Sequence, residues 1–436
     1  MRNNDIRNML GDIPGKRVEN EMAERDMEMG HALMDVIARR LYGIESSEGR
    51  ITVLFTDEFG RKMKRLSVGC GEPGMMVDAS FYRRPKGLDS RVPTPSIDSS
   101  TFFLGIDSIR NGVTFGGVRL LQTNESSYAR TDALRLSHAM THKLSMIGEP
   151  YGGSKMVVLV PETGKSESLL HKIGEIVEAL NGMFITAIDF GFEPQDALKI
   201  RERTKFILGF EGPGSLGASG VTTALGAFAG IRSILTEAFG SPQIAGRSFA
   251  IQGLGSVGSK LAELILESGG RVFLCDNDDS KLGAFRGMGN VSMAEPQNIL
   301  FLDVDVLCPS GPAYVINPFT IERLRSRAVA GVANCVLEDE VRDDRLLREK
   351  GILFAPDFVL NAGGVIQGIE EYKGNGLKDA IDRLPVIPKN LRKVFRKARR
   401  DEIGTMAAAK EIARARRAVM GRGPARRQIS VPPSQW

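Results

Sequence analysis

Two lysines and one aspartate have the residue types and spacing for acid–base chemistry. Lys143 lies near the end of a helical pattern, and Lys155 follows a Tyr-Gly-Gly-Ser turn that leads into an apolar strand. Two glycines let the backbone approach a ligand closely, and a buried lysine beside another cation has a lowered pKa and can act as a base. Because lysines are usually solvated, a surface role remains the alternative interpretation.

Asp189 ends an apolar stretch, Phe-Ile-Thr-Ala-Ile-Asp, that begins at Phe184. Ligands of α/β proteins bind at the carboxyl ends of strands, where a carboxylate can exchange protons with a bound molecule. A carboxylate in this place can equally cap a turn or a helix. The chain therefore offers three candidate groups whose use depends on the elements that hold them.

A glycine-rich turn has the pattern of a dinucleotide-binding site. An apolar strand leads into Gly253-Leu-Gly255-Ser-Val-Gly258, a helical pattern follows over 257–267, and the next strand ends at Asp276. The three glycines permit a tight turn, close approach of the pyrophosphate, and close packing of the helix on the strand. The alternative is a turn of a doubly wound sheet that binds nothing. The predicted cofactor-binding residues here are Gly253, Gly255, Ser256, Val257, Gly258 and Asp276.

Asp276 indicates which dinucleotide would bind. Its carboxylate can accept hydrogen bonds from the ribose hydroxyls of the adenosine, but it would repel a 2′-phosphate. The sequence therefore favours NAD over NADP as the cofactor.

The elements that must position these residues alternate between strands and helices after residue 100. Strands are predicted at 101–107, 155–160 and 184–189, and helices at 133–147 and 169–180. This alternation is typical of an α/β sheet domain. Before residue 100 the patterns are weaker. Residues 22–42 have an amphipathic helical pattern that suits either the core or a subunit interface, and the proline-rich stretch 67–100 is interpreted as loop.

The segment 212–220 shifts abruptly to glycine and serine, which predicts a domain boundary and a hinge. Beyond it a helix is predicted over 221–237, followed by the glycine-rich turn and by further strands near residues 306, 329 and 353. These elements suffice for one nucleotide-binding domain. The predicted organisation is a substrate-binding and catalytic domain over 1–215, in which 1–100 is a divergent, oligomerising extension, then a Rossmann-type domain over 216–365 and a C-terminal helical segment with a basic tail over 366–436.

Length and composition limit the class of protein. The 436 residues, 42% of them hydrophobic, are enough for two or three globular domains. The N-terminus lacks the pattern of a signal peptide and apolar runs are short, so a cytoplasmic protein without a membrane partner is expected.

Four scattered cysteines without a Cys-x-x-Cys pair favour reduced thiols. His138 and His142 share a helical face but lack an evident third ligand, so no metal site is predicted.

The net charge of +5 hides an uneven distribution. Residues 386–436 contain 14 lysines and arginines against 3 acidic residues, so the rest of the chain is acidic. Such a basic segment is usually a solvated helical face, or packs on an acidic surface of a neighbouring domain or subunit. The distribution argues against a nucleic-acid partner for the chain as a whole.

A series of ordered motifs resembles the glutamate/leucine/phenylalanine/valine dehydrogenase family, most closely its branch that acts on apolar and aromatic amino acids. The two lysines have the family's spacing, and the motifs follow in the family's order over roughly residues 101–420. The matching stretches are Phe115-Gly-Gly-Val-Arg-Leu, Ala139-Met-Thr-His-Lys, Gly152-Gly-Ser-Lys, Ile185-Thr-Ala-Ile-Asp, Ser219-Gly-Val-Thr, the turn at Gly253, Ala333-Asn, and Ala355-Pro-Asp-Phe-Val-Leu-Asn-Ala-Gly-Gly-Val.

The resemblance implies a role for each candidate residue in the reversible reaction of an L-amino acid, NAD and water to a 2-oxo acid, ammonium and NADH. Lys143 would bind the α-carboxylate of the amino acid. Lys155 would activate the attacking water, and Asp189 would exchange protons with the amino group and the water. Asn361 and the backbone of Gly116 and Gly117 would fix the amino acid, and Thr222 and Asn334 match positions near the nicotinamide.

The resemblance also suggests the class of substrate. The glutamate branch has a lysine at the position of Phe115 and a hydroxyl residue at that of Gly368, and both bind a side-chain carboxylate. A carboxylate buried without such partners would be costly, so glutamate is not expected as the substrate. Phe115, Ala187, Val365 and Gly368 would line the side-chain pocket, and the small Gly368 suggests room for a large or aromatic side chain.

Other features follow from the family or depart from it. The family implies a homo-oligomer, C-terminal helices that return to the first domain, and closure about a hinge. Ser154 replaces a small residue, and Cys335 and Val336 replace a polar pair. The alternative interpretation is therefore a paralogue with altered chemistry or with a non-catalytic binding role, such as holding nucleic acid or an acidic partner on the basic C-terminus.

Overall fold

The computed structural model describes residues 49–57, 75–83, 101–107, 113–122, 126–160 and 164–420. The helix predicted over 22–42 lies outside these residues. The chain divides into two compact units. The first comprises Met1–His138, Gly152–Phe192 and Lys199–Phe206, and the second comprises Ala139–Tyr151, Glu193–Leu198 and Ile207–Trp436.

A mixed sheet forms the first unit. Its antiparallel part runs β1-β2-β3-β6, and β6 then pairs in parallel with both β4 and β5, while β7 extends the sheet beyond β4. The predicted strands at 101–107, 155–160 and 184–189 are confirmed as β3, β6 and β7. The strands of this unit are β1 (Gly49–Asp57), β2 (Met75–Arg83), β3 (Thr101–Ile106), β4 (Thr114–Phe115), β5 (Val118–Leu121), β6 (Gly152–Leu159) and β7 (Phe184–Ala187).

The interpretation of 67–100 as loop was wrong for β2. Pro73 and Pro85 lie just outside the strand Met75–Arg83, so they bound it rather than interrupt it. A proline at the end of a strand removes no hydrogen bond from the sheet ladder, whereas a proline inside would.

Helix α3 (Ser126–Ile147) packs on one face of the first sheet through its first half. Ala129 and Ala133 belong to an apolar cluster with Phe103 of β3 and with Val157 and Leu159 of β6. Gly105 of β3 makes this close approach possible, because a Cβ there would lie 2.5 Å from the carbonyl oxygen of Ala133. The unit also contains α4 (Glu167–Ala179), which Ser166 caps by accepting a hydrogen bond from the Leu169 N–H, and part of α5 (Pro194–Arg201).

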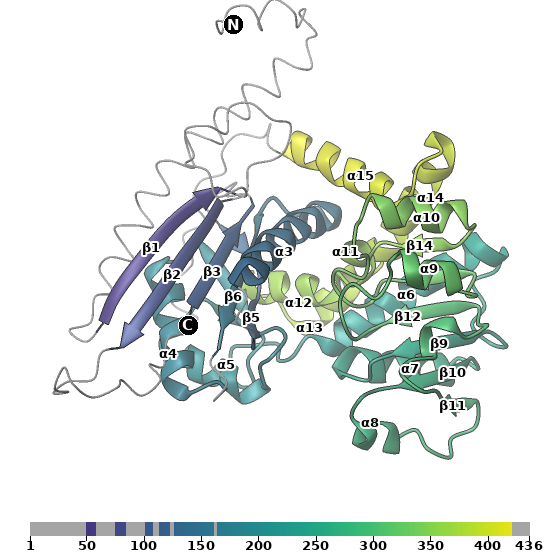
Figure 1. Ribbon diagram of the computed structural model, residues 1–436, viewed down its shortest axis with the longest axis horizontal. Coiled ribbons are helices and arrows are strands. Elements are labelled where there is room, and N and C mark those ends of the chain that lie inside the picture. The colour runs from purple at the N-terminus through teal and green to yellow at the C-terminus, as the bar shows by residue number, and fades with distance from the viewer. Residues whose placement is uncertain are drawn as a thin grey trace, which may run out of the picture. The chain divides into compact units, whose positions relative to one another are not determined.

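The second unit contains a six-stranded parallel sheet in the order β11-β10-β9-β12-β13-β14. This is the strand order of doubly wound dinucleotide-binding folds, so the predicted Rossmann-type α/β architecture is confirmed. Figure 1 draws these strands in green. They are β9 (Ser248–Gln252), β10 (Arg271–Cys275), β11 (Val291–Met293), β12 (Val306–Pro309), β13 (Ala328–Ala330) and β14 (Leu353–Ala355).

The remaining elements of the second unit connect or follow these strands. A short strand, β8 (Ile207–Leu208), precedes them, and a 3-10 helix spans Ile299–Phe301. The helices are α6 (Gly220–Phe239), α7 (Ser256–Glu267), α8 (Asp279–Gly283), α9 (Pro318–Arg323), α10 (Arg342–Glu349), α11 (Asp357–Leu360), α12 (Gly363–Tyr372), α13 (Leu377–Arg383), α14 (Val386–Asp401) and α15 (Thr405–Met420).

The C-terminal helices pack against α6 and against the end of α3. Two glycines of α6 permit this, since a Cβ at Gly226 would lie 2.5 Å from Ile387 of α14 and one at Gly230 would lie 2.3 Å from Leu360. Asn390 of α14 is buried and its side-chain amide donates a hydrogen bond to the Met146 carbonyl at 2.7 Å. Met146 belongs to the second compact unit, so the predicted return of the C-terminal helices to the first domain stays a prediction.

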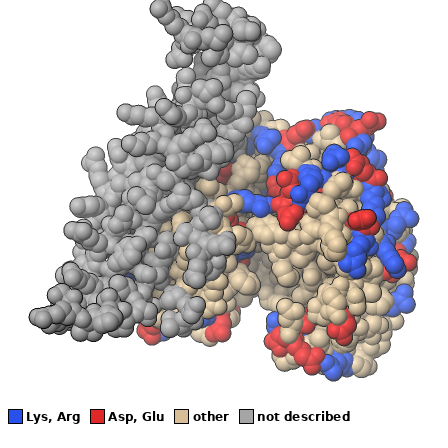
Figure 2. Space-filling model, in the orientation of Figure 1, with Lys and Arg blue, Asp and Glu red and all other residues tan. Residues whose placement is uncertain are grey.

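Basic residues of α14 pair with acidic groups of the same unit. Lys397 lies 2.6 Å from both Asp401 and Glu411, and Arg399 forms an ion pair with Glu237 of α6. Figure 2 shows side chains of both signs intermixed over the second unit in that view. Among the described residues, no helix is both long and apolar enough to cross a membrane.

Three of the four cysteines lie in the described residues, and all three are buried free thiols. Burial raises the pKa of the Cys308 thiol to about 12. Burial also raises the pKa of Cys275 to about 11, although the Gly253 N–H bonded to that residue opposes the rise.

Candidate functional site

The strand register of the first sheet places Lys155, Arg119 and Asp189 on one face. Val118 of β5 pairs in parallel with Met156 of β6 on one side and bridges to Ile188 on the other. Because side chains alternate between the faces of a sheet, the residues adjacent to Met156, Val118 and Ile188 share the opposite face. Helix α3 covers this face, since Val157 and Leu159 of the apolar cluster also lie on it.

The side chains of these three residues meet. The Asp189 carboxylate accepts a hydrogen bond from the Lys155 ammonium through Oδ2, and the same oxygen lies 3.2 Å from Nε of Arg119. The other end of the Arg119 guanidinium donates to Asp132 Oδ2 at 3.0 Å. Asp132 lies on α3 and its side chain is 1% exposed, while that of Lys155 is 6% exposed. The site is therefore a line of four charged groups, mostly withdrawn from solvent.

The pKa of each of the two predicted catalytic groups is lowered, by burial for Lys155 and by neighbouring charges for Asp189. Burial is the largest cause for Lys155 and lowers its pKa; the nearby Arg119 lowers it further, while Asp189 opposes the fall. For Asp189, burial alone would raise the pKa, but the charges of Lys155 and Arg119 and the hydrogen bond from Lys155 hold it well below its usual range. An ionised carboxylate next to a lysine that loses its proton easily is suited to proton exchange near neutral pH.

Two glycines between β4 and β5 make room for this arrangement. A Cβ at Gly116 would lie 1.8 Å from the backbone oxygen of Ser154, so the backbone itself passes too close for a side chain. A Cβ at Gly117 would lie 2.9 Å from the Lys155 ammonium nitrogen and 3.2 Å from Cβ of Asp189. Gly117 therefore leaves the space that the two charged side chains occupy.

A second group of predicted residues meets within the second unit. The side-chain oxygen of Asn334 accepts a hydrogen bond from the Lys143 ammonium at 3.3 Å and another from the Asn361 amide at 2.8 Å. The Asn361 amide also donates to the Val332 carbonyl at 3.1 Å, and its own side-chain oxygen is buried with no hydrogen-bond partner among the residues that the structure describes. Lys143 and Asn361 are both buried. Three residues far apart in the sequence thus meet: Lys143 and Asn361, which are predicted to bind the substrate, and Asn334, which is predicted to lie near the nicotinamide.

The loop that carries Asn334 is held in place on both sides. On one side the buried Asp357 accepts hydrogen bonds from the N–H of Val336 at 3.1 Å and of Phe358 at 2.7 Å. Burial, together with the charge of Glu340, raises the pKa of the Asp357 carboxyl. On the other side Cys335, with φ of 53°, accepts a hydrogen bond from the Tyr314 N–H at 2.8 Å.

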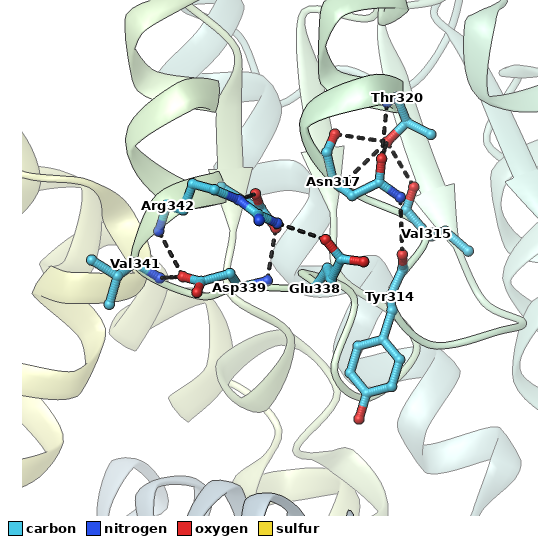
Figure 3. A network of polar contacts seen from close by, with 9 residues as sticks. Tyr314, Val315, Asn317, Thr320, Glu338, Asp339, Val341 and Arg342 are labelled. Carbon is cyan, nitrogen blue, oxygen red and sulfur yellow. Dashed lines mark hydrogen bonds and ion pairs between the residues drawn. The ribbon is translucent and has the colours of Figure 1, made fainter. Parts of the chain in front are cut away.

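Figure 3 shows the polar contacts at the start of α9 and at the start of α10, the helix that follows this loop. The Asn317 and Thr320 side chains cap α9 reciprocally, and Asp339 accepts hydrogen bonds from the N–H of Val341 and Arg342 at the start of α10. Arg342 also pairs with Glu338 at 2.7 Å. Caps of this kind fix the ends of short helices, so the contacts of Asp339 anchor the segment between β13 and α10 where α10 begins.

The glycine-rich turn has the geometry that a bound dinucleotide requires. Gly253 has φ of +95°, and a Cβ on Gly258 would lie 2.0 Å from the Gly253 oxygen, so α7 begins close against β9. A Cβ on Gly255 would meet nothing within 4 Å, which leaves open space at the N-terminus of this 12-residue helix. Backbone N–H groups at a helix N-terminus bind phosphate, so the residues present fit a pyrophosphate.

Asp276 follows β10, as expected, and its carboxylate also supports the turn itself. Oδ2 accepts a hydrogen bond from the Leu254 N–H at 2.7 Å and Oδ1 accepts one from the Asp278 N–H at 2.9 Å. Burial would raise its pKa, but these two N–H groups and Lys281, which lies 3.4 Å away, hold the pKa below its usual value. The sequence pattern gave no sign of the bond to Leu254.

The other predicted residues lie as follows. The Thr222 hydroxyl donates to Gln367 Oε1 at 2.7 Å and joins α6 to α12. Gly368 and Val365 lie on α12, and a Cβ on Gly368 would contact only Leu208, at 3.7 Å. Phe115 is buried at the end of β4 and Ala187 is half-buried at the end of β7. These contacts leave their proposed roles as predictions.

The structure adds Arg119 and Asp132, for which the sequence suggested no role. Arg119 stands within the Phe-Gly-Gly-Val-Arg motif, and the available signal was a charged residue inside a short, otherwise apolar strand. Asp132 gave no signal, because its contact depends on how α3 packs on the sheet.

Two other features of the described residues do not belong to this site. Glu167, His171 and Glu202 have ligand atoms close enough for a metal ion, but Lys199 lies 3.1 Å from each of the two carboxylates and supplies a cation there. A cavity of about 230 Å³ lies between the β14 edge of the second sheet and helices α14 and α15 and contains none of the predicted site residues.

The two histidines that share a face of α3 have different surroundings. His138 bonds to Asp107, and His142 packs on Phe358.

Comparisons with known proteins agree with this architecture. Residues 106–206 match the family model described as Glu/Leu/Phe/Val dehydrogenase, dimerisation domain, and residues 276–419 match that of Glutamate/Leucine/Phenylalanine/Valine dehydrogenase. A phenylalanine dehydrogenase of Caldalkalibacillus thermarum is 35% identical over 72% of this chain and 88% of its own length. A leucine dehydrogenase of Thermoactinomyces intermedius is 35% identical over 70% of this chain and 84% of its own.

A solved structure is similar as well. The crystal structure of L-tryptophan dehydrogenase from Nostoc punctiforme superposes with a TM-score of 0.63 at 32% identity and covers 74% of this chain and 94% of that chain.

Proposed function

The chain belongs to the glutamate/leucine/phenylalanine/valine dehydrogenase family, and we propose that it catalyses the NAD-dependent, reversible oxidative deamination of an apolar or aromatic L-amino acid. The observation that supports this most is the contact between Lys155 and Asp189 on one face of the first sheet, inside the segment that matches the family. The relatives named above act on phenylalanine, leucine and tryptophan. The products would be the 2-oxo acid, ammonium and NADH.

NAD held by the turn at Gly253 and by Asp276 would supply the acceptor for the hydride from Cα of the amino acid. The chain's own residues then have to move protons and direct water. Neutral Lys155 takes a proton from the water as that water attacks the imino carbon, and the lysine's lowered pKa makes the neutral form accessible. Asp189, whose resting form is ionised, can take up a proton from the amino group or from Lys155 and return it. The ammonium form of Lys155 stabilises the negative charge that develops on oxygen.

Lys143 and Asn361 would hold the amino acid in place. A buried ammonium pairs strongly with a carboxylate, so Lys143 is suited to the α-carboxylate of the substrate. The Asn361 oxygen, which is buried without a partner, can accept a hydrogen bond from the amino group. The backbone of Gly116 and Gly117 would complete the binding of the amino acid.

Cofactor choice and assembly are part of the same proposal. An ionised Asp276 after β10 favours the free ribose hydroxyls of NAD over the 2′-phosphate of NADP. Thr222 and Asn334 would lie at the nicotinamide end.

The description of the matching N-terminal model as a dimerisation domain supports a homo-oligomer. Buried free thiols support a reducing, cytoplasmic location.

The first experiment is a screen of amino acids with NAD and NADP in which NADH or NADPH formation is followed by absorbance. We expect activity with NAD, and none from Lys155→Ala even though that variant still binds NADH. Wild-type turnover in Lys155→Ala would refute the mechanism. If no amino acid produced NADH, the proposal would fail in favour of a non-catalytic role.

The second experiment compares kcat/KM for Trp, Phe, Leu and Glu. A Cβ at Gly368 would contact only Leu208, so space at this position favours a large side chain. We expect Gly368→Val to lower kcat/KM for Trp and Phe more than for Leu, and to leave the fold intact. A preference of the wild type for Glu or for a small aliphatic amino acid would contradict this assignment.

A further inference from the structure

Arg119 contacts the predicted catalytic pair without a role in the chemistry proposed above. Its Nε lies 3.2 Å from Asp189 Oδ2, the oxygen that also accepts the hydrogen bond from Lys155. Its Nη1 lies 3.0 Å from Asp132 Oδ2. One planar guanidinium therefore spans two carboxylates, one in the catalytic pair and one on α3.

Asp132, which anchors Arg119, is more deeply buried than Asp189, the carboxylate that Arg119 contacts. The Asp132 side chain is 1% exposed, the Arg119 side chain 13% and the Asp189 side chain 25%. A buried, charge-assisted pair such as Arg119–Asp132 has few alternative geometries, because either charge would be costly without the other. Gly105 contributes to this anchor, since it lets α3, and Asp132 with it, lie close on the sheet.

We propose that Arg119, anchored by Asp132, is a positioning residue that fixes the orientation of the Asp189 carboxylate relative to Lys155. The carboxylate could otherwise rotate about its side-chain bonds, since it is the most exposed member of the line. With Oδ2 held by both Arg119 and Lys155, the carboxylate keeps one orientation relative to the ammonium with which it would exchange a proton. This inference rests on the proposed function only for its catalytic consequence, because the geometry involves the first unit alone.

The same contact has an electrostatic consequence. The charged groups that act on Lys155 are Asp189, Arg119 and Asp132, and only Arg119 among them lowers its pKa. On Asp189, Lys155 and Arg119 both lower the pKa. Removal of the Arg119 charge should therefore raise the pKa of both catalytic groups, and the pH range of activity should move upward.

The test compares Arg119→Met, Arg119→Lys and Asp132→Asn with wild type, and uses Arg345→Met as a control that removes an exposed arginine of α10. For Arg119→Met we expect kcat to fall about 100-fold, the effect typical of a misplaced catalytic group, while KM for the amino acid changes only a few-fold. Both limbs of the pH profile should move to higher pH. Arg119→Lys should restore the pH profile but only part of kcat, since an ammonium is not a planar fork that spans both carboxylates.

Asp132→Asn keeps a hydrogen-bond acceptor for Arg119 but removes the negative charge at position 132. The kcat of this variant should therefore lie between the values of wild type and Arg119→Met. It also keeps the proposal testable if Arg119→Met does not fold, which circular dichroism and thermal unfolding would detect. Wild-type kcat and an unchanged pH profile in a folded Arg119→Met would overturn the proposal. For a partly folded Arg119→Met, a kcat per folded molecule equal to that of wild type would overturn it as well.

A measurement independent of turnover separates this proposal from the proposed function. The pH dependence of Lys155 modification by trinitrobenzenesulfonate, followed by peptide mass spectrometry, reports the ionisation of that lysine. Its midpoint should rise in Arg119→Met and stay at the wild-type value in Arg345→Met. If the wild type deaminated no amino acid and this shift were still seen, the positioning role would stand and the proposed function would fail. An unchanged midpoint would refute the positioning role even in an active enzyme.

Discussion

The adjacent glycines Gly116 and Gly117 should respond to the same substitution in opposite ways. In Gly117→Ala the new Cβ would lie 2.9 Å from the Lys155 ammonium nitrogen, which is the flexible end of a long side chain. In Gly116→Ala the Cβ would lie 1.8 Å from the Ser154 oxygen, which belongs to the backbone of β6. The first substitution can be accommodated by a moving side chain, whereas the second requires the sheet to shift.

The magnitudes follow from these contacts. To reach van der Waals distance, the Lys155 nitrogen must move by roughly 0.5–1 Å, which rotation of its side chain allows at a cost of about 1 kcal/mol or less in folding stability. Misplacement of a catalytic group by about 1 Å lowers the rate about 100-fold, equivalent to about 2.7 kcal/mol in the activation barrier. For Gly116→Ala, a backbone overlap of this size should cost about 3 kcal/mol or more of stability.

The assay measures two quantities for each variant: the free energy of unfolding in urea and kcat in the presence of saturating amino acid and NAD. Gly289→Ala is the matched control, because a Cβ there would meet nothing within 4 Å. We expect Gly117→Ala to fold normally and turn over slowly, Gly116→Ala to be destabilised, and the control to resemble wild type. A Gly117→Ala enzyme with kcat within a few-fold of wild type would refute the reasoning, and so would equal destabilisation of the two variants.

Three further predictions concern ionisation and the helix ends. The kcat/KM for oxidative deamination should rise with pH as Lys155 loses its proton. The midpoint of this rise should lie below 10.5, the ordinary pKa of lysine, because burial disfavours the charged form of Lys155. A midpoint at or above 10.5 would contradict the buried environment of Lys155. Native protein at pH 8 should resist alkylation at Cys275 and Cys308, whose pKa values of about 11 and about 12 leave almost no thiolate, and mass spectrometry should detect modification only after unfolding. Asp344→Ala should lower the free energy of unfolding in urea by about 1–2 kcal/mol, because the carboxylate accepts the Met406 and Ala407 N–H groups at the start of α15. Asp344→Asn should cost less, since burial already raises the pKa of this carboxyl and a neutral amide keeps an acceptor; an equal loss in both variants would argue against a cap.

The elements that could be predicted from the sequence are those whose signal is local. The turn at Gly253 and the strands around it follow from glycine spacing and apolar runs, and the Rossmann-type sheet is present as expected. Strand β2 was missed because Pro73 and Pro85 were interpreted as breaks in the segment, although they only flank the strand. The beginning of α3 at Ser126 was missed because its first residues, Ser-Ser-Tyr-Ala-Arg-Thr, have no regular apolar spacing.

The residues of the candidate site also fall into those with a local sequence signal and those without one. Lys155 and Asp189 could be proposed because each lies at a strand end that the sequence reveals. Arg119 and Asp132 could not, because their contacts join residues 70 and 13 positions apart through the register of three strands and the packing of a helix. The contact of Asp276 with Leu254 was missed for a similar reason: the carboxylate was assigned to a ligand, and its use by the protein backbone depends on a turn whose shape only the structure shows.

The Gly116–Gly117 connection also limits how this part of the chain can change in length over evolution. Arg119 shares a face with Lys155 and Asp189 only because Val118 pairs with Met156 and bridges to Ile188. Insertion or deletion of a single residue between Phe115 and Val118 would shift that pairing by one and turn Arg119 to the opposite face of the sheet. Single-residue insertions and deletions should therefore be eliminated here by selection, even where every side chain in the motif is retained, whereas single-residue insertions after Gly287, where a Cβ would meet nothing within 4 Å, should be tolerated.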